Sequence, residues 1–555
     1  MSRLWNRTLD HYPDTGPRVF YLAIVVLSTI VLYYELYVQS AVSTNIIAQY
    51  HMSFPFFVYI VVVSNAVGAF ASLVAGLADR WGRANLVTYG LLVTGLLTWF
   101  GLPNSPNRWV YAVLLAGLGF VEGIVLVATP ALVRDYSPQL GRASAMGFWT
   151  MGPVIGSLIV AEVASHTLAS HPAWQDQFDI CGVVGVVVFV VALFGLRELS
   201  PRIRDQLMVK LEDRVLIEAR AAGIDVQEAL RHPWRQMLHL DIVGSAVAIS
   251  TFLFIYYTMV VFLVVYFGTV FAFSVQKADA LGNWVWAFDA LSLVVTGWLS
   301  DRLRVRKPFM VVGGVGAIVM TTLFALRTSH PHTGYYTFVI IMSLLAVFLG
   351  VAFAPWMASF TETVERRNPA LTATGLAIWG WILRVLVAVL LLVLPHVVTS
   401  ATPLVENGTQ VQALAKEFAG PIQTLGAVDP KTLAILSANP KNLPAGITAL
   451  GEVEAKLHVT AAVALARLDA AAKVPAADLA FLQKYGPTVE KAAAASPAEW
   501  RKWWWVAVGG EVVFLPLIFL MAGRWSPAAA RRDEQDHARQ VEAELAALGT
   551  ARAGA

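Results

Sequence analysis

Twelve long apolar segments constrain what this 555-residue chain can fold into. A helix that crosses a lipid bilayer needs about 20 consecutive, mainly apolar residues. Segments of this kind lie at residues 19–44, 55–78, 86–102, 109–133, 143–167, 178–197, 241–268, 279–300, 308–327, 335–358, 370–398 and 503–522. Charged residues make up 14% of the chain, whereas a soluble domain contains about 25%. The sequence therefore predicts an all-α integral membrane protein with twelve transmembrane helices.

Lysine and arginine are concentrated in alternate connections between these segments, and positive charge in short loops favours the cytoplasmic side. The connections on the side of the N-terminus carry Arg3, Arg7, Arg18, Arg80, Arg83, Arg134, Arg142, Arg302, Lys307, Arg366 and Arg367. The other side carries little beyond Arg108, Lys277 and Arg327. We therefore expect a multi-pass protein of the cytoplasmic (inner) membrane with both termini in the cytoplasm. The net charge of +3 reflects this bias, not nucleic-acid binding.

The apolar segments divide the chain into two six-helix bundles. Residues 18–197 form the first bundle, and residues 241–400 together with 501–523 form the second. A cytoplasmic N-terminal tail, a cytoplasmic linker, an insertion and a cytoplasmic C-terminal tail make up the rest, at residues 1–17, 198–240, 401–500 and 524–555.

The insertion at residues 401–500 is far longer than an ordinary connection between helices. It is rich in alanine, is interrupted by prolines, and has helix-like stretches near residues 404–418, 446–472 and 476–495. The predicted topology puts it on the extracytoplasmic side. Two interpretations stay open: a helical insertion without a role of its own, or a cap over a translocation mouth or a module that docks a partner.

The sequence offers no group of residues suited to a metal or a cofactor. Cys181 is the one cysteine, so an internal disulfide is impossible. His166 with His171, and His330 with His332, lie in loops without a cysteine or carboxylate beside them, and zinc ligands have a different spacing. The chain also lacks the Gly-x-x-x-x-Gly-Lys-Ser/Thr motif of ATP-driven machines. We expect neither a metal nor a cofactor, and we expect that the protein is not an enzyme.

A short charged loop follows the second apolar segment, and a similar loop follows the eighth. The first reads Ala-Gly-Leu-Ala-Asp-Arg-Trp-Gly-Arg at residues 75–83, and the second reads Gly-Trp-Leu-Ser-Asp-Arg at residues 297–302. The first loop resembles the Gly-x-Leu-Ala-Asp-Arg-x-Gly-Arg-Arg/Lys signature of the major facilitator superfamily. The resemblance implies two pseudo-symmetric bundles that rock against each other. It also implies gating roles for Asp79, Arg80, Gly82, Arg83, Asp301 and Arg302, with Asp135 as an ion-pair partner of the two arginines of the first loop.

The fifth segment contains Gly-Phe-Trp-Thr-Met-Gly-Pro-Val-Ile-Gly at residues 147–156. This resembles an element that is frequent in proton-coupled drug exporters of the superfamily. Gly152 and Gly156 would give close helix packing across the interface between the bundles, and Pro153 would kink the helix. The fourth segment lacks the arginine that those exporters carry there.

Ionisable residues inside predicted spans are costly and usually functional, and four of them stand out. They are Glu35, Glu122, Asp289 and Arg384. All four approach the depth of the bilayer midplane, where transporters place substrate and coupling ions. We interpret Glu35 and Glu122 as proton-coupling groups, because a carboxyl group in a low-dielectric surrounding takes up a proton more readily. Asp289 and Arg384 are either substrate-binding residues or a buried structural ion pair.

The helix arrangement of the superfamily adds expectations about the cavity. It implies that Glu35 and Glu122 both face the central cavity and that Asp289 and Arg384 are neighbours in the second bundle. Polar and aromatic residues in the same spans suit an organic solute, although aromatic stripes in spans often serve packing alone. As substrate-binding candidates we add Tyr34, Gln39, Tyr256, Tyr257 and Trp356.

Three functions fit these observations. The first is a secondary active transporter that moves a small organic solute by alternating access and is driven by protons; Arg384 favours a carboxylate. The second is a proton-driven multidrug exporter. The third is a membrane receptor or scaffold that uses the same fold without transport. The expected partners are the solute, protons and the lipid bilayer, and we expect a monomer.

Overall fold

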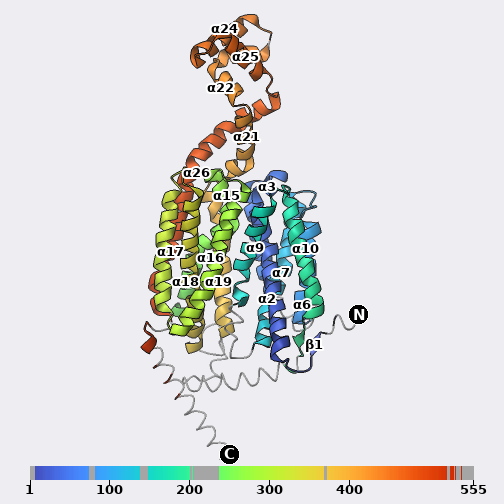
Figure 1. The fold of residues 1–555 in the computed structure, drawn as a ribbon, viewed down its shortest axis with the longest axis vertical. Coiled ribbons are helices and arrows are strands. Elements are labelled where there is room, and N and C mark those ends of the chain that lie inside the picture. The colour runs from blue at the N-terminus through green and yellow to red at the C-terminus, as the bar shows by residue number, and fades with distance from the viewer. Residues whose placement is uncertain are drawn as a thin grey trace, which may run out of the picture. The chain divides into compact units, whose positions relative to one another are not determined.

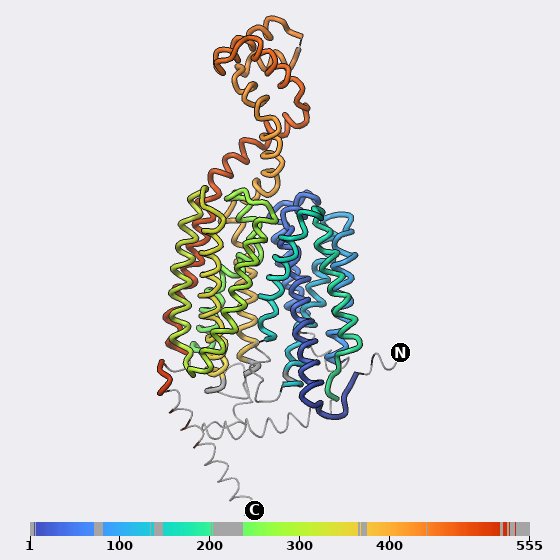
Figure 2. Tube along the Cα trace, in the orientation of Figure 1, coloured from blue at the N-terminus to red at the C-terminus, as the bar shows by residue number. Residues whose placement is uncertain are grey.

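The computed structural model describes residues 5, 7–73, 82–137, 148–200, 203, 237–367, 372–439, 441–521, 525–529, 532, 535 and 539. The chain splits into two compact units. The first comprises Met1–Val398 and Pro497–Ala555, and the second comprises Thr399–Ser496. Figure 2 shows the course of the chain through them.

The first half of the first unit contains six long helices that match the first six predicted segments (Figure 1). They are α2 (Thr15–Ala41), α4 (Phe54–Leu73), α6 (Arg83–Leu96, continued by η2, Leu97–Gly101), α7 (Arg108–Tyr136), α9 (Gly152–Thr167) and α10 (Trp174–Gly195). The short helix α3 (Ser43–Gln49) follows α2. Within this half α4 packs on α7, α10 on α6, and α2 on both α9 and α10.

The second half is built in the same way. Its helices are α14 (Leu240–Phe252), α15 (Phe254–Phe271), α16 (Val275–Leu303), α17 (Lys307–Arg327), α18 (Tyr335–Arg367), α19 (Thr372–Val397) and the last part of α26 (Ala476–Leu517), which η5 (Ile518–Leu520) follows. Helices α14 and α15 together form one span, broken at Leu253. Helix α18 packs on both α16 and α17.

Eleven described helical segments are long and apolar enough to cross a membrane. The predicted span that is not among these eleven is the eighth, at residues 279–300; it corresponds to α16, which is long enough but carries Asp279, Asn283 and Asp289. Phe194, Ile340 and Phe519 expose more than half of their side chains, as lipid-facing residues of a membrane bundle do. The prediction of an all-α membrane protein with twelve spanning helices is confirmed.

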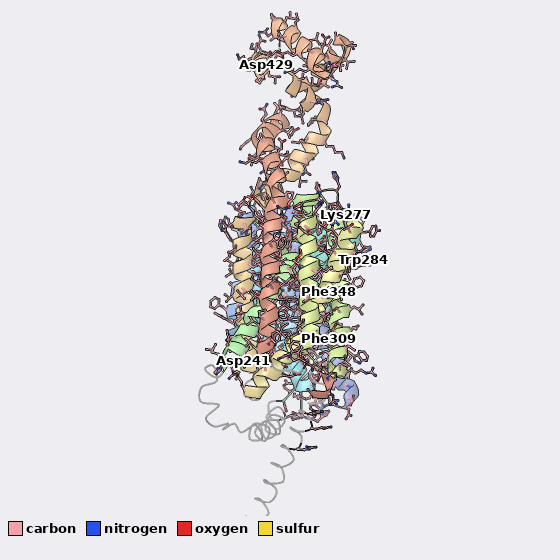
Figure 3. The ribbon with its side chains drawn as sticks, turned by 90° about the vertical axis from the view of Figure 1, so that its left-hand side faces the viewer. Asp241, Lys277, Trp284, Phe309, Phe348 and Asp429 are labelled. Carbon is pink, nitrogen blue, oxygen red and sulfur yellow. The ribbon has the colours of Figure 1, made fainter. Side chains whose placement is uncertain are left out.

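The two ends of the first unit carry different structures. At one end, which we call the β1 end, the strand β1 (Thr8–Leu9) pairs in parallel with β2 (Glu198–Leu199). The other end carries α3 and the α15–α16 turn, and we call it the α3 end (Figure 1). Asp241 of α14 lies near the β1 end and Lys277 of α16 near the α3 end (Figure 3).

A buried polar network holds the short sheet against the first half. The guanidinium of Arg7 is buried, and its Nη1 donates to Thr88 Oγ1 (2.8 Å) and to the carbonyl of Ala192 (3.0 Å). The carboxylate of Glu198 accepts a hydrogen bond of 2.7 Å from the backbone N–H of Arg83, the first residue of α6. A negative charge at this position also interacts favourably with the helix dipole.

Gly82 makes the approach of Glu198 to α6 possible. Its φ of +86° lies in a region that residues with a side chain rarely adopt. A Cβ at this position would also collide with Oε1 of Glu198. The backbone conformation and the contact with Glu198 therefore both require glycine at this position, independently of any gating role.

The second unit is a small helical bundle of its own. Its helices are α20 (Ala401–Pro403), η4 (Leu404–Gly408), α21 (Thr409–Glu417), α22 (Ala419–Ala427), α23 (Pro430–Ala438), α24 (Leu443–Leu457), α25 (Ala461–Ala472) and the first part of α26. One apolar core contains Ala427, Val428, Ala449, Val453 and Ala464. The predicted stretch at 446–472 is interrupted, because His458 adopts a positive φ of 53° and ends α24.

We expect Gly82→Ala to lower the thermal stability of the protein, because alanine would be strained by about 1–3 kcal/mol at this φ and would displace Glu198 from the start of α6. Thermal unfolding in detergent measures the effect. Gly117→Ala in α7 is the matched control, since a Cβ there meets nothing within 4 Å. Equal unfolding temperatures for the two variants would contradict this account.

Candidate functional site

A cavity of about 1240 Å³ lies between the two halves of the first unit. Helices α2, α4, α7 and α9 line it from the first half, and α14, α15, α16, α18 and α19 line it from the second. Its lining is mainly apolar, with polar side chains at Tyr33, Tyr37, Gln39, Ser40, Asn65, Glu122, Tyr256, Tyr257, Asp289 and Arg384. Sites for small organic molecules have this composition and are typically about 300–1,000 Å³.

Contacts between the halves close the cavity toward the α3 end. The rings of Phe54 and Phe262 meet edge to face with their centroids 5.7 Å apart. The amide of Asn283 in α16 donates to Ser165 Oγ in α9 (2.9 Å). In the opposite direction the cavity lining continues to Leu238, just before α14. The cavity therefore extends from the middle of the bundle toward the β1 end.

The two predicted proton-coupling acids lie in different surroundings. Glu122 of α7 lines the cavity and is 3% exposed, and its Oε1 has no hydrogen-bond partner among the residues that the structure describes. Glu35 of α2 is 1% exposed and lies inside the first half, where a Cβ on Gly185 of α10 would collide with its Oε1 and where it interacts with Thr94 of α6. Neither oxygen of Glu35 has a hydrogen-bond partner among the described residues. The expectation that both acids face the cavity therefore fits the position of Glu122 and not that of Glu35.

The two acids are nevertheless close enough to interact electrostatically. Cys181 of α10 interacts with both of them. Burial of a charge without a partner is costly, and like charges near each other add to that cost. One proton on this pair removes most of the repulsion.

Asp289 of α16 and Arg384 of α19 both line the cavity. Arg384 interacts electrostatically with Tyr33 of α2 and Tyr257 of α15, and Asp289 interacts with Tyr256. In the part of the chain that the structure describes, no ion pair joins Asp289 to Arg384. The structure therefore does not contain the buried ion pair between Asp289 and Arg384 that was one of the two interpretations.

The remaining substrate-binding candidates divide into two groups. Gln39, Tyr256 and Tyr257 line the cavity. Tyr34 and Trp356 are buried and are not among its lining residues. The indole of Trp356 instead packs inside the second half, where it stacks on Phe360 with centroids 4.9 Å apart.

Tyr33, Tyr37 and Ser40 line the cavity but were not among the sequence-based candidates. Their spacing of four and three residues puts them on one face of α2. This spacing is present in the sequence and is the signal that could have identified them.

The glycines of the fifth predicted segment pack within the first half. A Cβ on Gly152 would meet Thr29 of α2, and a Cβ on Gly156 would meet Tyr33 of α2. The structure thus places them against α2 rather than across the interface between the bundles. Pro153 lines the cavity and lies in the first turn of α9, directly after the break at Met151 that separates α9 from the helical residues 148–150.

The first predicted gating loop is described only in part. Asp79 and Arg80 lie outside the described residues. Arg83 of α6 pairs with Asp135 of α7, and its Nη1 donates to both carboxylate oxygens at 2.8 and 2.7 Å. This pair joins two helices of the first half at the β1 end.

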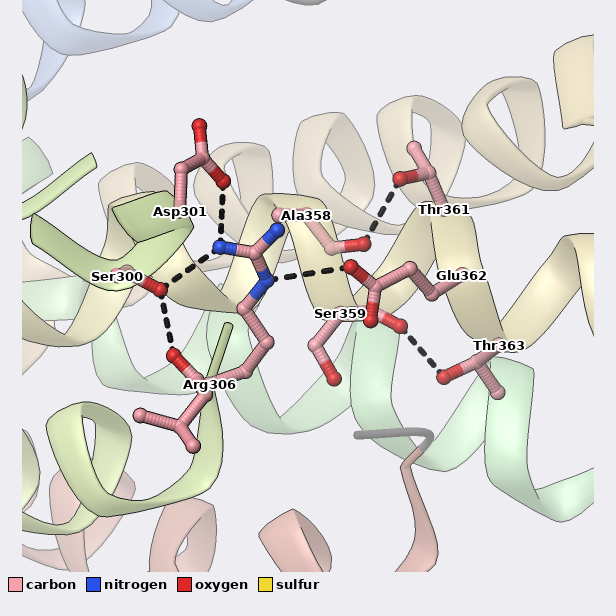
Figure 4. A network of polar contacts seen from close by, with 9 residues as sticks. Ser300, Asp301, Arg306, Ala358, Ser359, Thr361, Glu362 and Thr363 are labelled. Atoms are coloured by element: carbon pink, nitrogen blue, oxygen red, sulfur yellow. Dashed lines mark hydrogen bonds and ion pairs between the residues drawn. The ribbon is translucent and has the colours of Figure 1, made fainter. Parts of the chain in front are cut away.

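Residues 297–302, the second predicted charged loop, form the end of α16, and Arg306 shortly after this helix is the centre of a polar network (Figure 4). Its Nη1 pairs with Asp301 (2.6 Å) and donates to Ser300 Oγ (2.9 Å), and its Nε pairs with Glu362 of α18 (3.1 Å). Arg302 lies over the ring of Trp298, 5.2 Å from its centroid. The sequence identified Asp301 but not Glu362, because its approach depends on how α18 packs on α16.

Two halves of membrane-spanning helices around one central cavity define a polytopic protein of the transporter class. The sequence model described as Major Facilitator Superfamily matches residues 25–390. The chain belongs to the major facilitator superfamily, whose members are membrane transporters rather than enzymes.

Several curated proteins are similar in sequence. Sialin from Homo sapiens is 23% identical, over 44% of this chain and 50% of its own length. The phosphoglycerate transporter protein from Salmonella typhimurium is 23% identical, over 43% of this chain and 53% of its own length. The multidrug resistance protein MdtL from Shewanella is 29% identical, over 27% of this chain and 36% of its own length. The chain spans about half the length of sialin and of the phosphoglycerate transporter protein, and it spans less of the multidrug resistance protein MdtL.

Solved structures share the fold. A bacterial homologue of the human lysosomal transporter Spinster, in an inward-facing and occupied conformation, has a TM-score of 0.54 at 14% identity. The alignment covers 94% of this chain and 98% of that chain. A proton:xylose symporter of the superfamily has a TM-score of 0.53 at 13% identity, over 69% of this chain and 89% of its own. At these identities the likeness shows the fold alone.

Proposed function

We propose that the protein is a secondary active transporter that moves a small organic anion across a membrane by alternating access. The observation that carries this proposal is the position of Arg384 in a 1240 Å³ cavity between the two halves. Of the described lining residues, Arg384 is the one with a fixed positive charge. The named relatives are consistent with an anion: one is a phosphoglycerate transporter and another a probable chloroplastic anion transporter from Oryza sativa subsp. japonica.

The surroundings of Arg384 suit recognition of a carboxylate or a phosphate. A guanidinium offers donors in a planar fork that matches the two oxygens of such a group. Tyr33 of the first half and Tyr257 of the second line the same cavity as the arginine and interact with it electrostatically. An anion held between them would contact both halves at once, and its binding would therefore depend on how the halves are oriented.

A multidrug exporter is the second candidate. Glu122 and Asp289 place two carboxyl groups in the cavity, and tyrosine rings line the same space. A lipophilic cation would find both negative charge and aromatic faces there. The short match to the multidrug resistance protein MdtL points in the same direction. Binding of carboxylates as opposed to cationic drugs separates the two candidates.

We further propose coupling to protons through Glu122 and Glu35. Glu122 lies on the cavity wall and exchanges a proton with the solution that fills the cavity. Glu35 lies behind it and interacts with it, so protonation of one affects the other. Arg83, Asp135, Asp301 and Arg302 serve the gate at the β1 end. The distribution of lysine and arginine favours a cytoplasmic location for that end.

We expect organic carboxylates to raise the unfolding temperature of the purified protein, because a ligand that binds the native state at about 100 times its Kd stabilises it by about 2.7 kcal/mol. Arg384→Gln should abolish this shift. Arg108→Gln is the matched control, since Arg108 lies at the start of α7 and does not line the cavity. A thermal-shift panel of organic acids, sugars and cationic drugs measures the effect. Stabilisation by the cationic drugs alone would overturn the anion assignment and support the exporter.

We expect Glu122→Gln and Glu35→Gln each to abolish accumulation of solute driven by a pH gradient while leaving solute exchange intact, because glutamine mimics the protonated acid and cannot cycle. Uptake and counterflow in proteoliposomes measure the two activities. Glu511→Gln is the control, since that buried acid of α26 accepts a hydrogen bond from Thr321 and lies outside the cavity lining. Full accumulation by both variants would rule out these acids as proton carriers.

A further inference from the structure

A second, smaller pocket lies between the two halves on the way from the large cavity to the α3 end. Its volume is about 30 Å³. It is lined from four helices, α2, α9, α15 and α16. Tyr37, Ser40 and Val260 line both this pocket and the large cavity, so the two spaces adjoin. We call it the Asp279 pocket after the one acid that lines it.

No hydrogen bond or ion pair among the described residues explains the burial of Asp279. It is 4% exposed, and its Oδ2 has no hydrogen-bond partner in that part of the chain. It does not cap its own helix, because the side chain of Ser274 accepts the hydrogen bond from Lys277 N at the start of α16. The hydroxyl of Ser157, which lines the pocket from α9, also lacks a partner.

No described side chain with a positive charge lines the pocket. From α2 it is faced by Tyr37 and Ser40, and from α9 by Ser157. The residues of α15 that line it are apolar, and Trp286 lines it from α16. Lys277 is two residues from Asp279, but its ammonium lies over the ring of Phe273, 3.9 Å from the centroid. The negative charge of Asp279 is thus not compensated by any residue that lines the pocket.

The size and chemistry of the pocket restrict what it can hold. A space of this volume accommodates a water molecule or a single small ion, since one water needs about 10–15 Å³ on this scale. Carboxylate and hydroxyl oxygens are the ligands that hard cations prefer. One carboxylate neutralises one positive charge, whereas a divalent ion would leave an uncompensated charge in a low-dielectric surrounding.

We propose that the Asp279 pocket is a site for one monovalent cation, either a proton on the carboxyl group or a sodium ion held by Asp279 with the hydroxyls of Ser40 and Ser157. This inference rests on the proposed alternating access, because the pocket is formed only where the two halves meet. When the halves separate at the α3 end, Asp279 faces water and is charged. Closure buries it, and the bound cation removes the cost of that burial.

The position of the pocket determines the side from which the cation enters. The cation enters from the compartment at the α3 end and is enclosed as that end closes. Tyr37 and Ser40 separate it from the large cavity, where Asp289 of the same helix is the next acid along α16. The Asp279 pocket is thus an entry station for the coupling ion, distinct from the proposed proton carriers of the first half.

Distances between spin labels at the α3 end test the proposal without any knowledge of the solute. Labels replace two exposed residues, Ala48 in α3 and His332 in the α17–α18 loop, in a Cys181→Ser background. Pulsed electron paramagnetic resonance on the full-length protein gives the distance distribution. The conditions are an alkaline buffer without sodium, an acidic buffer without sodium, and the alkaline buffer with sodium chloride in place of potassium chloride.

We expect a long-distance component in the alkaline, sodium-free buffer and its loss when the cation is supplied. Loss in acid alone identifies a proton, and loss with sodium identifies a sodium ion. Asp279→Asn should give the short distance in all three buffers, because an amide is neutral and needs no cation, whereas Asp279→Glu should retain the response.

Glu511→Gln is the matched control and should respond as the parent protein does. A distribution that no cation changes, or a full response in Asp279→Asn, would overturn the cation site. If an added organic acid still shifts the distances in that case, the proposed transport function stands without this site. If the cations shift the distances but no organic acid binds in the thermal-shift panel, the site stands and the anion assignment fails.

Discussion

The cost of charge inside the membrane is the constraint on which the rest of this structure depends. Each charged side chain in a spanning helix must have a partner, take up a counter-ion or face water. At the β1 end this requirement is met by direct pairs, as between Arg83 and Asp135. In the middle of the bundle Glu122, Asp289 and Arg384 line a common cavity. The ion pairs at the β1 end hold helices together, and the ionisable groups of the lining adjoin the space that a solute would occupy.

The cost of unpaired charge also explains why the contacts at the two ends of the first unit differ. Arg306 joins α16 to α18 through Glu362, and Arg83 joins α6 to α7, so both networks tie helices within one half. At the α3 end, by contrast, the contacts cross between the halves and are aromatic or neutral, as between Phe54 and Phe262. Neutral contacts can separate without leaving a charge unpaired. Each half is thus suited to move as a body, with the cavity at the interface.

The sequence predicted the fold well, because the length and polarity of a spanning helix are local properties. It also predicted the pairing of Arg83 with Asp135, since both lie at helix ends that the family signature brings together. It could not predict which neighbouring helices Glu35 faces. Successive residues of a helix are about 100° apart around its axis, and packing against α6 and α10 sets how α2 is rotated about that axis. The sequence did not predict the burial of Asp279, near the start of a predicted span, because that burial also depends on how the helices pack.

Direct observation of a bound solute by cryo-electron microscopy tests the central claim, that the cavity between the halves is the transport site. The protein is prepared with the organic acid that gives the largest thermal shift. We expect density for its anionic group beside Arg384, between Tyr33 of the first half and Tyr257 of the second. Density for the solute within one half alone, or in the unit Thr399–Ser496 with the cavity empty, would contradict it.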